Sequence, residues 1–442
     1  MKKLIALLLA LAMVMALAAC GASEAPAATE VPKADAPAAE APAAPAEAEV
    51  LEFYHGYFHA ESEWPAAKVM RDIYDEFAAQ HADGPVVFKP IAVENRDEIV
   101  SAQLAGGNYP DLVDLGSTIP AAAIAQGLIL DLKPYIDENG LEAAVGLNYT
   151  QNLVDGAIYT VHDQIETRGL WYNAAVLEKA GATVEDLSTW EGVAATMEKV
   201  RALNDGTYGY AAGQGSLKMM YAMLAGTEEG RALLNSEISA DVINNPTFAT
   251  AFKTIAKMDQ DNGSAYTTPD VGNLMADFNA NGMAAMLSNG VWNASGIGAD
   301  LVDAIQPMVF PGNVSMATAG TGLTVSANMS EAKTALALEF VKYMVSEEVQ
   351  TKIFLGVQAN PCNSTIDLNA LAAESGDPVV QKLALACSLC NGADIIVSDV
   401  SYTWGGDVGN SIINALMECA TAGTDIDARF ELLQKELLAL IG

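Results

Sequence analysis

Val50-Leu51-Glu52-Phe53-Tyr54 begins the stretch of sequence that decides the fold class. This mostly apolar run predicts a strand, which leads into the loop His55-Gly56-Tyr57-Phe58-His59. Pro65 then opens a helix, because proline is tolerated in the first helical turn. Apolar residues recur at a spacing of four from Val69 to Phe77, so this helix is expected to bury one face.

Two more strand–helix units follow the first one. Strands are predicted at 85–88 and 111–115, and helices at 95–105 and from Pro120 to a stop at Gly127. A strand, a helix and a further strand at this spacing indicate a parallel sheet covered by helices. The predicted fold class is therefore α/β.

The alternation continues through the rest of the chain. Helices are expected at 174–180, 190–203, 227–235, 246–261 and 330–345, strands at 208–211, 284–287, 305–309 and 320–326, and a mostly helical region at 366–442, interrupted near 393–402. A single sheet of this length is less plausible than two α/β lobes. We find no internal repeat.

The composition restricts the class of protein. The chain has 442 residues, of which 51% are apolar and 18% charged, and its formal net charge is −34. This charge argues against nucleic-acid binding, which needs clusters of Lys and Arg, and against electrostatic docking on anionic lipid. Five cysteines do not make a disulfide scaffold, and four histidines leave little room for a His-rich metal site.

The N-terminus predicts export and a lipid anchor. A short basic start is followed by the apolar run Leu4–Ala19, which is too short for a spanning helix and suits a signal peptide. The junction Leu17-Ala18-Ala19-Cys20-Gly21 resembles a bacterial lipobox, so we expect residues 1–19 to be removed and Cys20 to be lipidated. The membrane contact is then made through the lipid alone.

Residues 20–49 are expected to form a tether after the signal peptide. From residue 22 they contain 13 alanines and five prolines, and the prolines prevent a long helix. A spacer of this kind suits a cell wall better than a narrow periplasm. We therefore expect the protein on the extracellular face of the cell membrane in a Gram-positive-type envelope.

The sequence lacks three common motifs of catalytic and nucleotide-binding sites. There is no Gly-x-Ser-x-Gly elbow, no phosphate-binding Gly-x-x-x-x-Gly-Lys loop and no His-Glu-x-x-His pair. We therefore expect no enzyme activity, no cofactor and no metal. Cys387-x-x-Cys390, with Cys362 and Cys419, leaves three alternatives open, namely a zinc site, disulfides or buried free thiols.

Five segments carry more specific motifs. They include a Gly-x-x-Pro-Asp-Leu pattern and a Phe-x-x-x-Gly-x-Ala-Ala-Met pattern, and they lie at Leu104–Val113, Leu128–Tyr135, Glu166–Asn173, Phe278–Trp292 and Ala337–Gln350. In this order they resemble the extracellular solute-binding proteins of the maltose/multiple-sugar type. The resemblance covers about residues 50–360.

The resemblance implies a periplasmic-binding-protein-like fold of type II, in which a hinge joins two lobes and a ligand lies in the cleft between them. The N-terminal lobe would contain 50–164 and about 315–357, and the C-terminal lobe about 165–314 and 358–442. The implied function is a monomeric substrate-binding lipoprotein of an ABC importer, which captures a sugar or oligosaccharide and delivers it to permease subunits.

Candidate ligand-binding residues follow from the loops at the carboxyl ends of the strands, where α/β sheets bind ligands. Sugars need aromatic faces and planar polar groups. The candidates are Trp292, Glu166, His55, Tyr57, Ser117, Gln214, Asn289, Asn293, Trp404 and Asp407. The resemblance implies that Trp292 stacks on the sugar and that Glu166 presents a carboxylate from the crossover strand.

Other functions remain open at this point. The same fold would bind a polyamine or another small polar solute if Glu166, Asp163, Asp399 and Asp407 made the cleft acidic. A ligand sensor subunit that signals to a histidine kinase is a further alternative. An extracellular hydrolase is disfavoured by the missing catalytic motifs.

Overall fold

The structure is a computed structural model that describes residues 48–116, 119–211, 214–263 and 271–442. Residues Ala48–Gly442 make up one compact unit. The expected signal peptide, Cys20 and the tether up to residue 47 lie outside the described residues. Among the helices of the described ranges, none combines the length and the apolar character needed to cross a membrane.

A four-stranded sheet contains the three strands predicted first. Its order is β11–β3–β1–β2, and β1 (Glu49–His55) runs parallel to β2 (Val86–Ala92) and to β3 (Leu112–Asp114). β11 (Leu323–Val325) joins antiparallel to β3 from much later in the sequence. The predicted parallel sheet is therefore confirmed, with one antiparallel strand added. We call it the first sheet.

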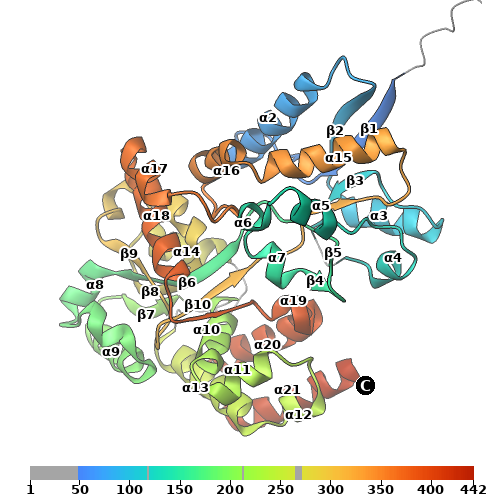
Figure 1. The fold of residues 1–442 in the computed structure, drawn as a ribbon. Coiled ribbons are helices and arrows are strands. Elements are labelled where there is room, and N and C mark those ends of the chain that lie inside the picture. The colour runs from blue at the N-terminus through green and yellow to red at the C-terminus, as the bar shows by residue number, and fades with distance from the viewer. Residues whose placement is uncertain (1–47, 117–118, 212–213, 264–270) are drawn as a thin grey trace, which may run out of the picture. The chain divides into compact units, whose positions relative to one another are not determined.

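Helices α2 (Pro65–Gln80) and α15 (Glu331–Met344) lie beside the first sheet (Figure 1). Both pack on it through aromatic side chains. The ring centroid of Phe53 lies 4.9 Å from that of Tyr74 and 5.0 Å from that of Phe340. The apolar spacing that predicted α2 therefore reflects a buried face, as amphipathic helices require.

A six-stranded mixed sheet forms the second half of the fold. Its order is β12–β10–β6–β8–β7, and β9 pairs with β6 on the same edge as β10. The strands are β6 (Glu166–Asn173), β7 (Tyr208–Ala211), β8 (Ala284–Gly290), β9 (Ile305–Met308), β10 (Val314–Thr318) and β12 (Ile395–Val397). β6 is antiparallel to β8, β9 and β10. We call this the second sheet.

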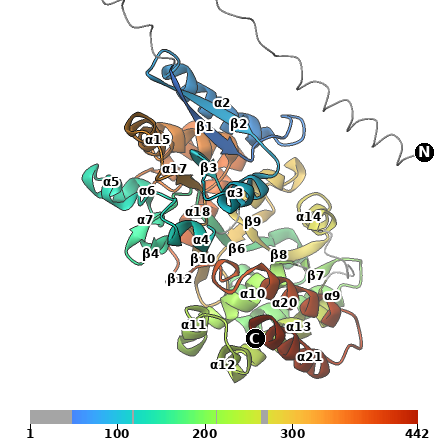
Figure 2. The same cartoon turned by 90° about the vertical axis from the view of Figure 1, so that its right-hand side faces the viewer.

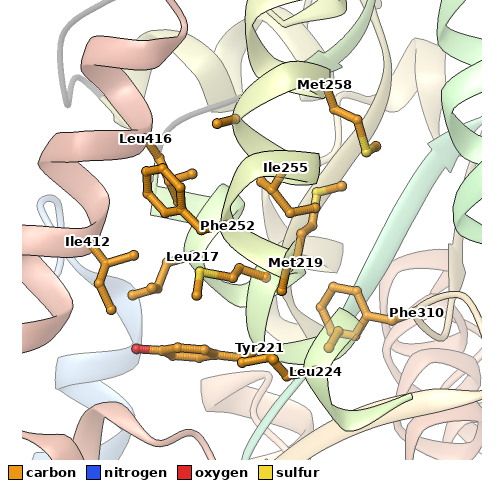
Figure 3. Close-up of a cluster of buried hydrophobic side chains, with 14 of the residues drawn as sticks. Leu217, Met219, Tyr221, Leu224, Phe252, Ile255, Met258, Phe310, Ile412 and Leu416 are labelled. Carbon is orange, nitrogen blue, oxygen red and sulfur yellow. The ribbon is translucent and has the colours of Figure 1, made fainter. Parts of the chain in front are cut away.

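A large hydrophobic core lies beside the second sheet. Helices α10 (Gln214–Ala225), α13 (Pro246–Asn262) and α20 (Gly406–Cys419) face one another there, and α21 (Ile426–Ile441) packs against α13 and α20 (Figure 2). Figure 3 shows the side chains that meet between these helices, among them Leu217, Met219, Phe252, Ile255, Ile412 and Leu416. The core explains why the C-terminal region is mostly helical.

The remaining elements connect or cover the two sheets. In chain order they are α3 (Arg96–Ala105), α4 (Ala121–Ala125), α5 (Lys133–Glu138), α6 (Glu142–Val145), α7 (Asn148–Gln151), the hairpin β4 (Leu153–Val154) and β5 (Ala157–Ile158), α8 (Ala174–Lys179), α9 (Trp190–Ala202), α11 (Glu228–Leu234), α12 (Ala240–Ile243), α14 (Val271–Asn279), α16 (Glu347–Lys352), α17 (Leu368–Ser375), α18 (Pro378–Asn391) and α19 (Ser401–Trp404). Short 3₁₀ turns lie at Val184–Ser188, Val291–Gly296 and Ala299–Leu301, and one π-helical turn lies at Ile353–Val357.

Several elements differ from the sequence prediction, among them the helices α10 and α14, which were not predicted, and the strands β1 and β10. The first strand includes His55, which was expected in the loop. Strand β10 at Val314–Thr318 was not predicted, because all five of its residues are buried and a fully buried strand shows no polar–apolar alternation. β10 belongs to the second sheet, so the chain returns to the first sheet only after Thr318.

Candidate functional site

Side chains on the two faces of the crossover segment at β6 line different cavities. Glu166 and Arg168, two residues apart, line two small pockets, whereas Ile165 just before the strand lines a cavity of about 630 Å³. Successive side chains in an extended chain point to opposite faces. The two pockets therefore lie on one face of the crossover segment, and the larger one, the rear cavity, lies on the other.

The first pocket, of about 230 Å³, is formed mainly by loops that follow strands of the first sheet. Its lining residues are Gly56, Tyr57, Trp64, Arg96, Asp114, Leu115, Gly116, His162, Glu166, Gly320 and Thr321. The rings of Tyr57 and Trp64 lie side by side with centroids 5.2 Å apart. This pocket therefore offers both aromatic surface and charged groups.

Arg96 is fixed tightly in the first pocket. Its Nη1 donates to the backbone carbonyl of Asp114 and lies 2.8 Å from Asp114 Oδ2. A Cβ on Gly56 would lie 2.5 Å from Arg96 Cζ, and one on Gly116 would lie 2.7 Å from Arg96 Nη2. The two glycines therefore allow the guanidinium to approach the backbone closely. Burial raises the pKa of Asp114 to about 6, although Arg96 opposes the shift.

The second pocket, of about 270 Å³, is formed by elements of the second sheet and its helices. Its lining residues are Arg168, Gly215, Leu217, Lys218, Leu274, Met275, Leu287, Ser288, Asn289, Ser401, Gly406, Gly409, Asn410 and Ile413. The pocket thus collects residues from β6, β8, α10, α14 and α20. Arg168 is its only contribution from the crossover strand in the described residues.

Four charged groups form a chain along the second pocket. Lys218 Nζ donates to Asp399 Oδ2 and, at 2.9 Å, to Ser401 Oγ. Arg168 Nε lies 3.7 Å from the same Asp399 oxygen, and Arg168 Nη2 lies 3.5 Å from Glu166 Oε2. Burial opposes ionisation of Asp399, but Lys218 holds the pKa of this carboxyl below its usual value. Two cations and two carboxylates balance one another here.

Trp292 lies beside this chain of charges and is half-buried. Arg168 Cζ lies over the indole, 4.7 Å from the ring centroid. Part of the indole packs on the neighbouring hydrophobic cluster. Trp292 is therefore close to the second pocket, but the predicted stacking surface is already in contact with a guanidinium.

The two predicted asparagines differ in position. Asn289 lines the second pocket, and its Nδ2 donates to Asn293 Oδ1 at 3.1 Å. Asn293 is fully buried and exchanges two amide hydrogen bonds with Asn279, at 2.9 and 3.1 Å. Asn293 therefore positions the turn after β8, and Asn289 is the member of the pair that reaches the pocket.

Two of the predicted residues are packed inside the fold. His55 is 2% exposed and lies 4.8 Å from Tyr74 between ring centroids. Burial, with Arg96 and Arg71 nearby, lowers the pKa of His55 to about 4. Trp404 is 4% exposed, belongs to the core of the second half, and donates from Nε1 to the Ser236 carbonyl at 2.9 Å.

Of the three other predicted residues, Asp407 is the one whose side chain belongs to the described part of the chain. Asp407 is exposed in the first turn of α20, and its neighbours Gly406 and Gly409 line the second pocket instead. Ser117 lies outside the described residues. Gln214 begins α10, and its side chain lies outside the described part of the chain. Of the eight candidates whose side chains are described, Tyr57, Glu166 and Asn289 line a pocket, and Trp292 adjoins one.

Sequence reasoning missed the cationic members of the site. Arg168 follows Glu166 by two residues on a predicted strand, so the period of two was a signal that both share a face. Lys218 and Asp399 are 181 residues apart, and no local pattern relates them. Trp64 and Arg96 were likewise not singled out, although both line the first pocket.

The four cysteines of the described region are buried free thiols in three separate places. Cys362 belongs to the core of the first half, Cys387 and Cys390 to the cluster around α18, and Cys419 to the core of the second half. Burial raises the pKa of Cys390 to about 12. Within the described ranges, no group of three or more His, Cys, Asp or Glu side chains has a metal-holding arrangement.

Comparison with known proteins gives one family match and several similar structures. Residues 72–378 match the model of a family described as bacterial extracellular solute-binding protein. The chain is similar to a Streptococcus pneumoniae solute-binding protein, solved in complex with the blood group A-trisaccharide. The two are 42% identical, the match covers 88% of this chain and 100% of that one, and the TM-score is 0.77.

Two further relatives are more distant. A probable secreted solute-binding lipoprotein from Streptomyces coelicolor is 15% identical with a TM-score of 0.72, and the match covers 88% of this chain and 98% of that one. The arabinooligosaccharide-binding protein of Bacillus subtilis (strain 168) is 27% identical over 180 residues. That match covers 35% of this chain and 39% of the relative's length. The Streptomyces structure supports the fold alone.

Proposed function

The chain belongs to the bacterial extracellular solute-binding protein family, and from this premise we propose that it binds a neutral oligosaccharide and delivers it to the permease of an ABC importer. The fold is the two-lobe α/β fold of type II solute-binding proteins. The family consists of binding proteins rather than enzymes, so the pockets hold a ligand without reacting with it.

One observation carries the choice of ligand class. The Streptococcus pneumoniae relative that matches over its whole length at 42% identity is a trisaccharide complex. The two pockets on one face of β6 agree with a ligand of more than one sugar unit, because Glu166 and Arg168 lead into different pockets. Tyr57 and Trp64 supply aromatic surface in the first pocket, as sugar C–H faces require.

The charges around the second pocket support a neutral ligand over a polyamine. The carboxylate of Asp399 is paired with Lys218 and lies near Arg168, and Glu166 is paired with Arg168. A cation would have to displace one of these partners and leave it unpaired, which is costly in a buried site. Asp407 is exposed and lines neither pocket.

Attachment and lobe boundaries are part of the same proposal. The lipobox at Cys20 supports a lipid anchor on the outer face of the membrane, with residues up to 49 as a tether. The lobes are proposed to be built around the first and second sheets, with β6 as a crossover strand of the hinge. Loss of lipid from the precursor when Cys20 is replaced by Ala, measured by mass spectrometry, tests the anchor.

Calorimetric titration with the blood group A trisaccharide tests the ligand class. We expect saturable binding with a Kd of about 1 μM or tighter, equivalent to about −8 kcal/mol. Spermidine serves as the cationic comparison and should produce no saturable heat. Binding of spermidine in place of the trisaccharide would overturn the proposal in favour of a polyamine.

A further inference from the structure

The indole of Trp292 lies on the backbone of Gly290. A Cβ built on Gly290 would overlap three consecutive carbons of the six-membered ring, namely Cζ2, Cζ3 and Cη2, at almost equal distances. Equal distances to three ring atoms place that point above the ring face rather than at its edge. The ring therefore occupies the space that a side chain at position 290 would fill.

Arg168 is the cross-strand neighbour of this space. In the antiparallel pairing of β6 with β8, Arg168 is the residue opposite Gly290. Side chains at opposed positions rise from the same face of a sheet, about 4.5–5.5 Å apart at Cβ. The missing side chain at Gly290 thus lets Trp292 fold back beside Arg168, and the guanidinium lies over the ring at 4.7 Å.

The Arg168 side chain keeps most of its hydrogen-bonding capacity. A guanidinium has five N–H donors, and in the part of the chain that the structure describes it makes one hydrogen bond, from Nη2 to Glu166 Oε2 at 3.5 Å. The approach of its Nε to Asp399, at 3.7 Å, is too long for a hydrogen bond. Nε is itself buried without a hydrogen-bond partner among the described residues. The ring contact and two loose ion pairs therefore hold the group in place, and the donors left for a ligand are those of Nη1 and Nη2.

From this geometry we propose that Trp292 is a positioning residue, which holds the guanidinium of Arg168 in the second pocket, and that Arg168 rather than the indole contacts the ligand. The proposal rests on the proposed oligosaccharide function. The donors of Arg168 and the carboxylate of Glu166 lie 3.5 Å apart and offer both halves of a hydrogen-bonding pair to neighbouring sugar hydroxyls. Arg168 thereby selects ligands rich in acceptor oxygens and rejects cations.

A double-mutant cycle with the blood group A trisaccharide separates this role from direct stacking. We expect Arg168→Met to weaken binding about 30-fold and Trp292→Ala about tenfold, as for central groups of an interface. In the Arg168→Met background, Trp292→Ala should change the Kd by less than about twofold, because its effect passes through Arg168. Trp292→Phe, which keeps a ring face, should bind within about threefold of the unchanged chain.

Two outcomes of the cycle would overturn the proposal. If Trp292→Ala weakens binding by the same factor with and without Arg168, the indole itself contacts the ligand. If Arg168→Met binds like the unchanged chain, Arg168 makes no ligand contact. Should Arg168→Met fail to fold, Arg168→Lys keeps the charge without the planar fork and should still bind about tenfold more weakly.

A measurement without ligand keeps this proposal apart from the proposed function. The chain has six arginines, so selective ¹⁵N labelling resolves their Nε–H signals, and Arg168→Lys identifies the signal of Arg168. We expect the indole ring current to displace this signal and Trp292→Ala to remove the displacement. An Arg168 signal that Trp292→Ala leaves unmoved contradicts the positioning role. Absence of trisaccharide binding to the unchanged chain contradicts only the proposed ligand.

Discussion

Each pocket is lined by an arginine that lies near an aspartate, but the two pairs are built differently. In the first pocket Arg96 Nη1 donates to both the backbone carbonyl and the carboxylate of Asp114, and the guanidinium is packed against glycine backbones. In the second pocket Arg168 is 3.7 Å from Asp399, whose closer partner is Lys218. The difference indicates that Lys218, by pairing with Asp399, leaves the guanidinium of Arg168 available to a ligand.

The pKa values of the two carboxyls express the same contrast. Burial raises the pKa of Asp114 to about 6 in spite of Arg96, and Asp163 nearby adds to the rise. At Asp399 burial acts in the same direction, but Lys218 and Arg168 together reverse it and lower the pKa. Arg96 therefore does not offset the burial of Asp114, whereas Lys218, Arg168 and the Ser401 backbone together offset that of Asp399.

The largest expected effect comes from removing the second cation. Lys218→Met leaves Asp399 buried with only its looser pair to Arg168, so we expect a loss of about 3–5 kcal/mol in the free energy of unfolding, measured by urea denaturation. Lys89→Met is the matched control, because its pair with Glu52 is exposed, with side chains 57% and 37% accessible, and should cost less than about 1 kcal/mol. Equal losses in the two variants would remove the contrast between the pairs.

The pH dependence of stability should differ in sign between the two carboxyls. Asp114 binds its proton more tightly in the folded state than in the unfolded state. Its contribution to the free energy of unfolding is therefore largest below about pH 3.8 and is lost as the pH rises to about 6. The loss amounts to about 3 kcal/mol, which Asp114→Asn should abolish. Asp399, whose pKa is lowered in the folded state, contributes stability that is lost as the pH falls. Asp399→Asn should remove this contribution. Parallel pH profiles for the two variants would contradict the comparison.

A smaller effect, on trisaccharide binding, is expected from replacing Trp64 in the first pocket. Trp64 is 41% exposed and lines this pocket, so Trp64→Ala should weaken trisaccharide binding by about 1 kcal/mol, or roughly fivefold. Phe58→Ala is the control, because Phe58 is similarly exposed at 39% but does not line the pocket. Calorimetry of both variants measures the difference. An equal loss for Phe58→Ala would extend the binding surface beyond the pocket.

Replacing Asp407 is expected to have the smallest effect on the free energy of unfolding. This exposed carboxylate lies in the first turn of the 14-residue helix α20, where it interacts favourably with the helix dipole. Asp407→Asn should lower the free energy of unfolding by about 0.3–0.5 kcal/mol and leave trisaccharide affinity unchanged. A fivefold loss of affinity would show that the second pocket reaches further along α20 than its lining residues indicate.

Most of the fold was predictable because its signals are local. The apolar spacing from Val69 to Phe77 and the strand at 111–115 depend on neighbours in sequence, and both elements are present as α2 and β3. β10 was missed because a strand buried on both faces lacks alternation. His55 was placed in a loop, although it continues the inward alternation of Leu51 and Phe53.

The site was less predictable because its geometry depends on contacts between distant segments. Glu166 and Asn289 were found from motifs and do line pockets, and the structure adds Arg168 and Lys218. The packing of Trp404 against Phe248 of α13, and its hydrogen bond to the Ser236 carbonyl after α11, could not be anticipated from its place in a polar loop sequence. An aromatic residue next to glycines suits a binding loop and a core equally well until its neighbours are known.

The alternation of β6 restricts how relatives of this chain can diverge. Glu166 and Arg168 are about 6.8 Å apart along the strand, and they face the pockets while Ile165 faces the rear cavity. Inserting or deleting one residue at the start of β6 would turn both charges toward that rear cavity and bring Ile165 or Thr167 to the ligand side. Ligand preference in this lineage can therefore evolve by exchanging side chains at positions 166 and 168, while the length of the segment stays constant.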